Sequence, residues 1–287
     1  MGSSGVSTTL HRPDGPDVEL PQQYSWVAPY AGGWMGFSGP DGTTTILDGQ
    51  GNPVQDPWPG LSAAVTSDGS SLATVLYAGG SDVDTQLWPT GGTDPDEGYG
   101  SHVVAFDGDL QYAGFVGPET VAYNLTVSTN QGATQTPYVA SWFSNDEPRE
   151  LTSVVDVRGA NDVTGVVSGM TEIDDVGGRY CAAVVTAETD TVVWETCEYR
   201  LGRFSPDGRY VLGVDPQSDG LGSQGVTILD AEDGEVVAEL TLPDGSFMQD
   251  GTWYLVRMRP DGTVEKALDP SRQGYDDSSP WRFAVTP

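Results

Sequence analysis

Short runs of alternating apolar and polar residues recur along the whole chain, and turns rich in Gly, Pro, Asp and Ser separate them. Alternation with a period of two is typical of strands that bury one face. No segment of the sequence keeps a sustained helical period, and the helix formers Leu, Lys and Glu are scarce. The pattern therefore predicts an all-β chain.

The clearest unit of this pattern covers residues 201–240. It contains four apolar runs, which end at Phe204, Val214, Leu229 and Leu240. The intervening turns contain Asp-Gly, which favours hairpins because Gly takes a positive φ without a Cβ penalty. Four short antiparallel strands in about forty residues are the size of one propeller blade.

Weaker units of the same kind cover most of the remaining chain. We place them at residues 24–54, 61–88, 101–151, 152–201 and 245–268. Residues 6–20 predict two further strands, and residues 281–285 a last one. Terminal strands that share one sheet remove exposed edges.

We therefore expect one domain, residues 6–287, folded as a single β-propeller. It has about seven four-stranded antiparallel blades, or alternatively six, and the N- and C-terminal strands close the ring. Residues 1–5 are expected to be a disordered tail or an added start, because they contain neither a basic nor an apolar stretch.

One strand–turn–strand sequence carries a family resemblance. Residues 204–211 read FSPDGRYV, and a second hairpin follows at residues 226–237, with weaker copies at 65–72 and 253–262. This pattern resembles the WD-repeat-like and TolB-like β-propellers, in particular the exported propeller domains of actinobacteria. No blade ends in Trp-Asp or opens with Gly-His, so the true WD pattern is absent. The resemblance implies the fold and a role in binding proteins or ligands, and it implies no particular activity.

The chain is strongly acidic. It has 42 Asp and Glu residues against 12 Lys and Arg, a formal net charge of −30, and Lys266 is its single lysine. Such a surface repels nucleic acids and anionic lipid headgroups, so neither is an expected partner. No run of about twenty apolar residues occurs, so this segment is not expected to insert into a membrane.

The two cysteines bracket a predicted hairpin. Cys181 and Cys197 lie on either side of a turn at residues 188–190, and this spacing places them at the same level of the two strands. We predict a disulfide between them, with two buried free thiols as the alternative. A disulfide places the protein in an oxidising compartment. We therefore expect the protein outside the cell or on the exterior of the envelope. It would then be either a free exported protein or the trimmed soluble part of an anchored one.

Few residues suggest chemistry. His11 and His102 are the two histidines, and no nucleophile elbow, zinc-protease helix or phosphate-binding loop accompanies them. We expect no catalytic residue and no cofactor. Calcium is the one metal considered, with Asp94, Asp96 and Glu97 as weak candidates in a Gly-rich loop, and a solvated loop is the alternative.

The expected function is a monomeric, non-catalytic binding or interaction module. Its ligand is an unknown protein, a small molecule or a glycan, recognised on one propeller face. Two alternatives stay open, namely a structural scaffold and a propeller enzyme, such as a glycosidase or lyase, that uses carboxylates in the central funnel. Aromatic residues such as Trp26, Trp34 and Trp194 are expected to pack between blades, with an aromatic glycan platform as the alternative reading.

Overall fold

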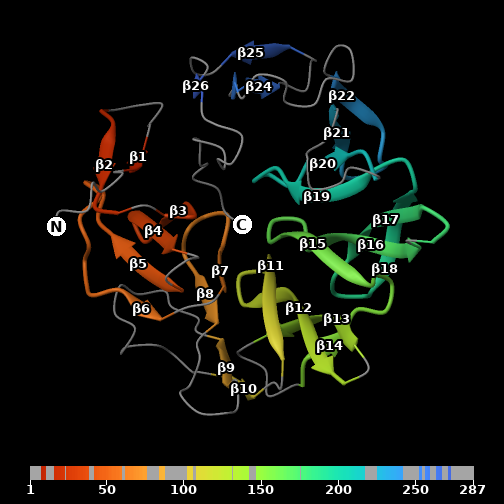
Figure 1. Cartoon of the computed structure of the whole chain (residues 1–287), viewed down its shortest axis with the longest axis horizontal. Coiled ribbons are helices and arrows are strands. Elements are labelled where there is room, and N and C mark those ends of the chain that lie inside the picture. The colour runs from red at the N-terminus through yellow and green to blue at the C-terminus, as the bar shows by residue number, and fades with distance from the viewer. Residues whose placement is uncertain are drawn as a thin grey trace. The chain divides into compact units, whose positions relative to one another are not determined.

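The computed structural model describes residues 8–10, 16–22, 24–38, 42–59, 62–75, 84–87, 102–105, 108–130, 132–141, 147–174, 176–216, 225–241, 252–253, 256–258, 263–266 and 271–272. Every regular element within these residues is a β-strand (Figure 1). The prediction of an all-β chain is therefore confirmed for the described residues. Two compact units divide the chain, one within residues 1–150 and one within residues 151–282.

Within the described residues, four sheets have four strands each, and consecutive strands pair antiparallel in chain order. Two of these sheets belong to the first unit: β3 (Trp26–Tyr30), β4 (Gly33–Ser38), β5 (Thr43–Leu47) and β6 (Trp58–Pro59), and then β11 (Asp109–Gly117), β12 (Thr120–Thr129), β13 (Gly132–Ser141) and β14 (Arg149–Glu150). Two belong to the second unit: β15 (Asp156–Asn161), β16 (Val166–Asp174), β17 (Arg179–Thr186) and β18 (Thr191–Thr196), and then β19 (Arg200–Phe204), β20 (Tyr210–Val214), β21 (Gly225–Asp230) and β22 (Val236–Thr241). A four-stranded antiparallel meander is the blade of a β-propeller.

The other described strands form antiparallel pairs. They are β1 (Thr8–Leu10) with β2 (Val18–Leu20), β7 (Ser62–Val65) with β8 (Leu72–Val75), β9 (Asp84–Leu87) with β10 (His102–Ala105), β23 (Thr252–Trp253) with β26 (Ser271–Arg272), and β24 (Val256–Met258) with β25 (Val264–Lys266). The β1–β2 pair confirms the two strands predicted near the N-terminus. The last predicted strand, residues 281–285, lies outside the described residues.

The predicted boundary between the third and fourth units is wrong. β10 was assigned to the fourth unit, but its residues pair with β9, from His102 opposite Leu87 to Ala105 opposite Asp84. The fourth sheet begins only at Asp109, in β11.

One kind of turn is repeated in both units. Ser205 Oγ donates to Asp207 Oδ1 at 2.6 Å and accepts from Tyr210 N–H at 3.1 Å. The Ser205 hydroxyl is the main cause that lowers the pKa of Asp207. Gly208 completes the turn at φ 71°, a conformation that favours glycine. Turn chemistry thus explains this Asp-Gly pair, as predicted.

The turn at residues 66–71 has the same hydrogen bonds. Thr66 Oγ1 donates to Asp68 Oδ1 at 2.7 Å and accepts from Ser71 N–H at 2.9 Å. Gly69 lies at φ 70°. Its carbonyl accepts a hydrogen bond from Ala31 N–H at 3.0 Å, just after β3 of the neighbouring sheet. This turn therefore joins successive sheets as well as the two strands of its own hairpin.

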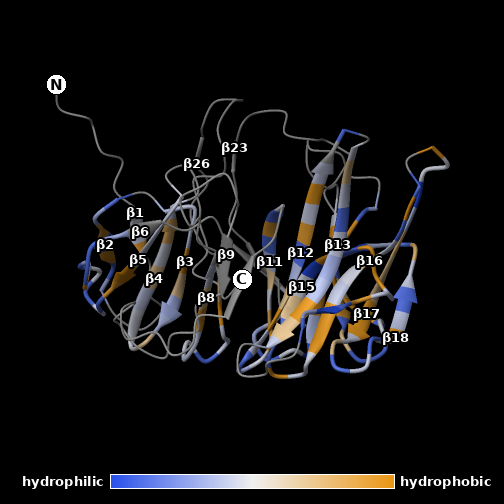
Figure 2. Ribbon diagram, turned by 90° about the horizontal axis from the view of Figure 1, so that it is seen from below, coloured by the Kyte–Doolittle hydropathy of each residue, from blue (hydrophilic) through white to orange (hydrophobic). Residues whose placement is uncertain are grey.

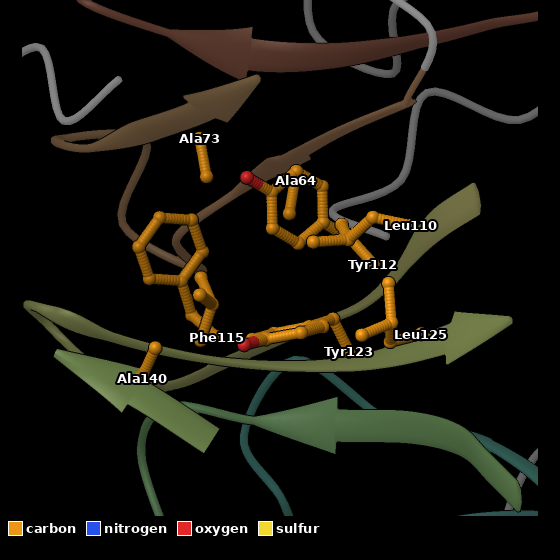
Figure 3. Packing of buried hydrophobic residues seen from close by; sticks show 9 residues of the cluster. Ala64, Ala73, Leu110, Tyr112, Phe115, Tyr123, Leu125 and Ala140 are labelled. Atoms are coloured by element: carbon orange, nitrogen blue, oxygen red, sulfur yellow. The ribbon is translucent and has the colours of Figure 1, made fainter. Parts of the chain in front are cut away.

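Apolar side chains fill the space between neighbouring sheets of the first unit. Figure 3 shows one such cluster, with residues from β7 and β8 facing residues from β11, β12 and β13. Phe115 and Tyr123 belong to this cluster and are buried. Tyr112 Oη donates to the Thr74 carbonyl at 3.3 Å, which gives the buried phenol a partner. The core of this unit thus lies between sheets, as it does in propellers.

Candidate functional site

The β16–β17 hairpin extends beyond the other strands of its sheet. β15 pairs with β16 as far as Met170, and β18 pairs with β17 as far as Ala182. The pairing of β16 with β17 continues for three more residue pairs, to Asp174 opposite Arg179. We call residues 172–181 the arm. It extends about 10 Å past its neighbours at about 3.3 Å per residue, and Figure 2 shows its end projecting from the sheet.

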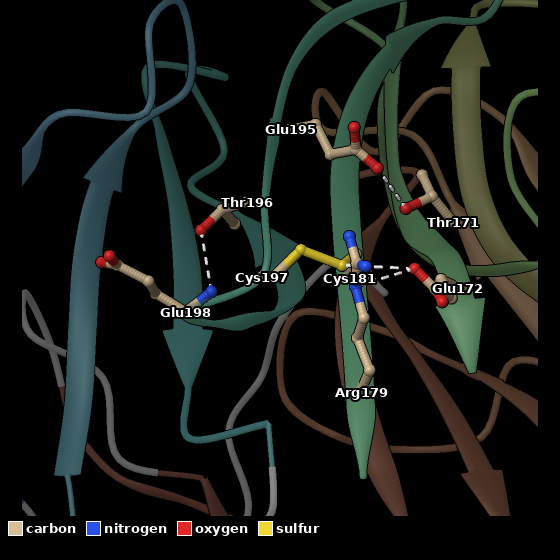
Figure 4. Close-up of a disulfide and its surroundings, with 8 residues drawn as sticks. All are labelled: Thr171, Glu172, Arg179, Cys181, Glu195, Thr196, Cys197 and Glu198. Carbon is tan, nitrogen blue, oxygen red and sulfur yellow. Dashed lines mark hydrogen bonds and ion pairs between the residues drawn. A yellow bond between two sulfur atoms is a disulfide. The ribbon is translucent and has the colours of Figure 1, made fainter. Parts of the chain in front are cut away.

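A disulfide connects the base of the arm to the neighbouring strand. Cys181 is bonded to Cys197, the residue that follows β18, and this confirms the predicted disulfide (Figure 4). Cys181 is buried, whereas Cys197 is exposed. The bond lies one residue beyond the last β17–β18 pair, so it takes the place of pairing that has ended there.

Polar contacts around the disulfide also hold the base of the arm. Arg179 Nε lies 3.0 Å from Glu172 Oε2, across the two strands of the arm. Thr171, bulged out of the ladder just before the arm, donates to Glu195 Oε1 on β18 at 2.6 Å. Both partners of the ion pair are substantially exposed, and exposed pairs contribute at most about 1 kcal/mol. The disulfide is therefore the stronger brace.

The described residues of the tip include two hydrogen bonds to Asp174 and an exposed apolar residue. Asp174 Oδ1 accepts hydrogen bonds from Val176 N–H at 3.1 Å and from Gly177 N–H at 2.8 Å. The Val176 side chain is fully exposed, and Ile173 is 46% exposed. The turn thus holds one valine in solvent at the end of a braced hairpin.

The opposite end of the same sheet is held by Asp190, in the β17–β18 turn. Its Oδ2 accepts from Thr152 N–H at 2.8 Å and from Thr152 Oγ1 at 2.7 Å, and its Oδ1 accepts from Ser153 N–H at 3.2 Å. Burial of the carboxylate opposes ionisation, but these hydrogen bonds outweigh it and lower the pKa of Asp190. Asp190 also has φ 52°, which few residues other than Gly, Asn and Asp adopt.

We predict that Asp190→Ala lowers the free energy of unfolding by about 2 kcal/mol, because it removes charge-assisted hydrogen bonds and leaves alanine at positive φ. Asp190→Asn should cost about half as much, since Asn tolerates this φ and keeps one acceptor oxygen. Because folding lowers the pKa, this stabilisation is present above the ordinary value of 3.8 and is lost as the pH falls through the lower folded value. Urea titrations at pH 7 and pH 3 measure both effects, and an Asp190→Ala cost that is equal at both pH values would contradict the assignment.

Several residues singled out in the sequence fall in different places. Asp94, Asp96, Glu97 and His11 lie outside the described residues. His102 begins β10. Among the residues that the structure describes, no group of three or more His, Cys, Asp or Glu side chains forms a metal site.

Two further features of the sequence can be followed in the described residues. Trp26, Trp34 and Trp194 are partly buried against apolar clusters, as predicted for packing residues. Trp194 Nε1 also donates to the Ala231 carbonyl of the next sheet at 2.9 Å. Asn124, which begins an Asn-Leu-Thr sequence, is 5% exposed on β12, so that side chain is not available for glycosylation.

The arm itself was not predicted. Its strands and the disulfide were expected, but not the length by which β16 and β17 outrun β15 and β18. The sequence contains one signal for the arm. Cys181 follows the polar, Gly-containing stretch 174–178 by three residues, so a disulfide at Cys181 marks a level of the hairpin close to its tip.

Several solved structures are similar to this chain at low sequence identity. No family model matches the chain, and no curated protein matches it. A protein assigned as TolB from Agrobacterium tumefaciens is 14% identical, with a TM-score of 0.48, over 78% of this chain and 83% of that one. BamB from Moraxella catarrhalis is 11% identical, with a TM-score of 0.42, over 92% and 74%. The β-propeller domain of the trilobed protease from Pyrococcus furiosus is 18% identical, with a TM-score of 0.37, over 53% and 55%.

These similarities concern fold alone. The four-stranded antiparallel sheets of the described residues define the class of protein, a β-propeller, which is the fold that the predicted resemblance to TolB-like propellers implies. Among the described residues, no helix is long and apolar enough to cross a membrane.

Proposed function

We propose that this chain is a non-catalytic recognition module that acts outside the cytoplasm, on the cell exterior or in the cell envelope. The arm is the observation that carries the proposal. It extends past its sheet, a disulfide holds its base, and its tip exposes an apolar residue. None of these features contributes to packing of the core, so we assign them to recognition. The disulfide supports an oxidising compartment. The net charge of −30 supports a protein that stays soluble and avoids nucleic acid.

The proposal includes the complete architecture. We infer a monomeric single-domain propeller of six or seven blades, closed by residues 6–20 and 281–285. The four four-stranded sheets and the additional strand pairs support this count.

Removal of residues 281–287 should then lower the thermal midpoint markedly, because a blade would lose its closing strand and expose an edge.

Sedimentation velocity tests the recognition function. The full chain with its disulfide intact carries a fluorescent label and is added to the exterior fraction of cells of its source organism. We expect a discrete faster-sedimenting species that saturates with added chain and disappears when unlabelled chain competes. A label that sediments as the free monomer at every concentration would contradict a protein-binding role. A thermal-melt panel of sugars and metabolites then tests small ligands.

A further inference from the structure

The arm presents its tip in a form suited to docking. A singly exposed valine is ordinary in a soluble protein. Val176 differs because it lies at the end of a two-stranded segment without neighbouring strands, and such hairpins are marginally stable unless they are braced. Here the Cys181–Cys197 disulfide provides the brace at the base, and the two hydrogen bonds to Asp174 order the tip.

Carboxylates lie next to this apolar tip in the sequence and near the base of the arm. Asp174 and, in the sequence, Asp175 precede Val176 directly. Glu195 and Glu198 are exposed near the base of the arm (Figure 4). Arg179 is paired with Glu172, so it leaves the other carboxylates of the arm uncompensated. The arm therefore has an apolar tip and acidic flanks.

We propose that the arm inserts Val176 into an apolar pocket of a protein partner, and that Lys and Arg side chains surround this pocket. The inference rests on the proposed recognition function. A specific interface buries about 800 Å² on each partner, which is more than a valine and a half-exposed isoleucine provide. The acidic flanks of the arm must then lie in the interface too. Their negative charge favours a partner whose pocket is surrounded by Lys and Arg side chains.

Other occupants of the tip fit less well. A second copy of the chain would bring two acidic arms and two net charges of −30 together. An anionic lipid surface would repel the same carboxylates. A pre-ordered arm also loses little conformational entropy on docking, which favours a specific protein pocket.

Site-specific photo-cross-linking tests the proposal. A photoreactive amino acid replaces Val176 in the full, disulfide-bonded chain, which is irradiated in the exterior fraction of the source organism. Val163 is the matched control position, since it is a valine, 61% exposed, in the β15–β16 turn at the other end of the same sheet. Further probes at Val54 and Val236 sample other exposed positions.

We expect one protein adduct from position 176 and none from position 163. Mass spectrometry of the cross-linked peptide should show an apolar partner segment with Lys or Arg close by. An adduct of twice the mass of the chain, or cross-links to lipid only, overturns the proposal. Adducts at Val54 or Val236 without one at position 176 overturn the docking role of the arm but are compatible with the proposed recognition function. Absence of protein adducts at all four positions contradicts both proposals.

Affinity measurements with the purified partner then test the chemistry. Val176→Ser should weaken binding about tenfold or more, as expected for a residue that fills a pocket, whereas Val163→Ser should leave the affinity unchanged. Both residues are exposed, so neither variant should alter the thermal midpoint. Raising the NaCl concentration from 50 to 500 mM should slow association, because salt screens the steering charges. An association rate that does not depend on salt would rule out the basic rim.

Discussion

Removing the Cys181–Cys197 disulfide should lower the free energy of unfolding by about 3 kcal/mol. The two cysteines are 16 residues apart, and closing a loop of this size restricts the unfolded chain by roughly that amount at 25 °C. The Cys181→Ala and Cys197→Ser double variant suits the test. Alanine leaves no polar group at the buried position 181, and serine suits the exposed position 197.

Urea titrations of the wild type and of the double variant, each with and without a reductant, measure this effect. The reduced wild type and the double variant should have similar midpoints, and the reductant should not change the double variant. Hydrogen exchange of residues 172–181 should increase in both, because the free-standing hairpin has lost its main brace. Equal stability with and without the disulfide would mean that the polar contacts of Glu172, Arg179 and Thr171 are sufficient to hold the arm.

The same loop explains why the disulfide was predictable. Cys181 and Cys197 lie on opposite sides of the turn at residues 188–190, and local spacing alone places them at one level of a hairpin. The strands of residues 201–240 were predictable for a similar reason. Their turns contain Asp-Gly or Ser-x-Asp-Gly, whose side-chain and φ requirements are local.

Features that depend on the pairing between strands were not predictable from the sequence. The short, mostly apolar run at residues 102–105 fits a strand in either sheet, and its pairing with β9 spans a long connection that carries no pattern of its own. The arm likewise exists only because β15 and β18 stop where β16 and β17 continue. Alternation reports that a residue belongs to a strand, but not how far the neighbouring strands accompany it.

A close contact between a glycine and an aromatic ring is a further feature of this kind. Gly36 lies on β4, and a Cβ atom added there would lie 2.6 Å from Cδ1 and Cε1 of Tyr24. Tyr24 is 1% exposed and packs in a cluster with Leu20, Val27 and Leu47. The ring therefore has no free space into which to move.

Gly36→Ala should accordingly lower the free energy of unfolding by about 2–3 kcal/mol, the upper part of the range of about 1–3 kcal/mol for overpacking in a filled core. Gly49→Ala, in the turn that follows β5 of the same sheet, is the control, because its added Cβ would meet nothing closer than the Gly32 carbonyl oxygen at 3.7 Å. That variant should stay within about 0.5 kcal/mol of the wild type. Urea titrations compare the two.

A double-mutant cycle assigns the cost to the contact between the two residues. Tyr24→Leu alone should destabilise the protein, since it leaves a cavity where the ring was. In the Gly36→Ala background the same substitution should cost less, because it also removes the collision with the added methyl group. Effects that add without coupling would show that alanine at position 36 acts through the backbone and not through the Tyr24 ring.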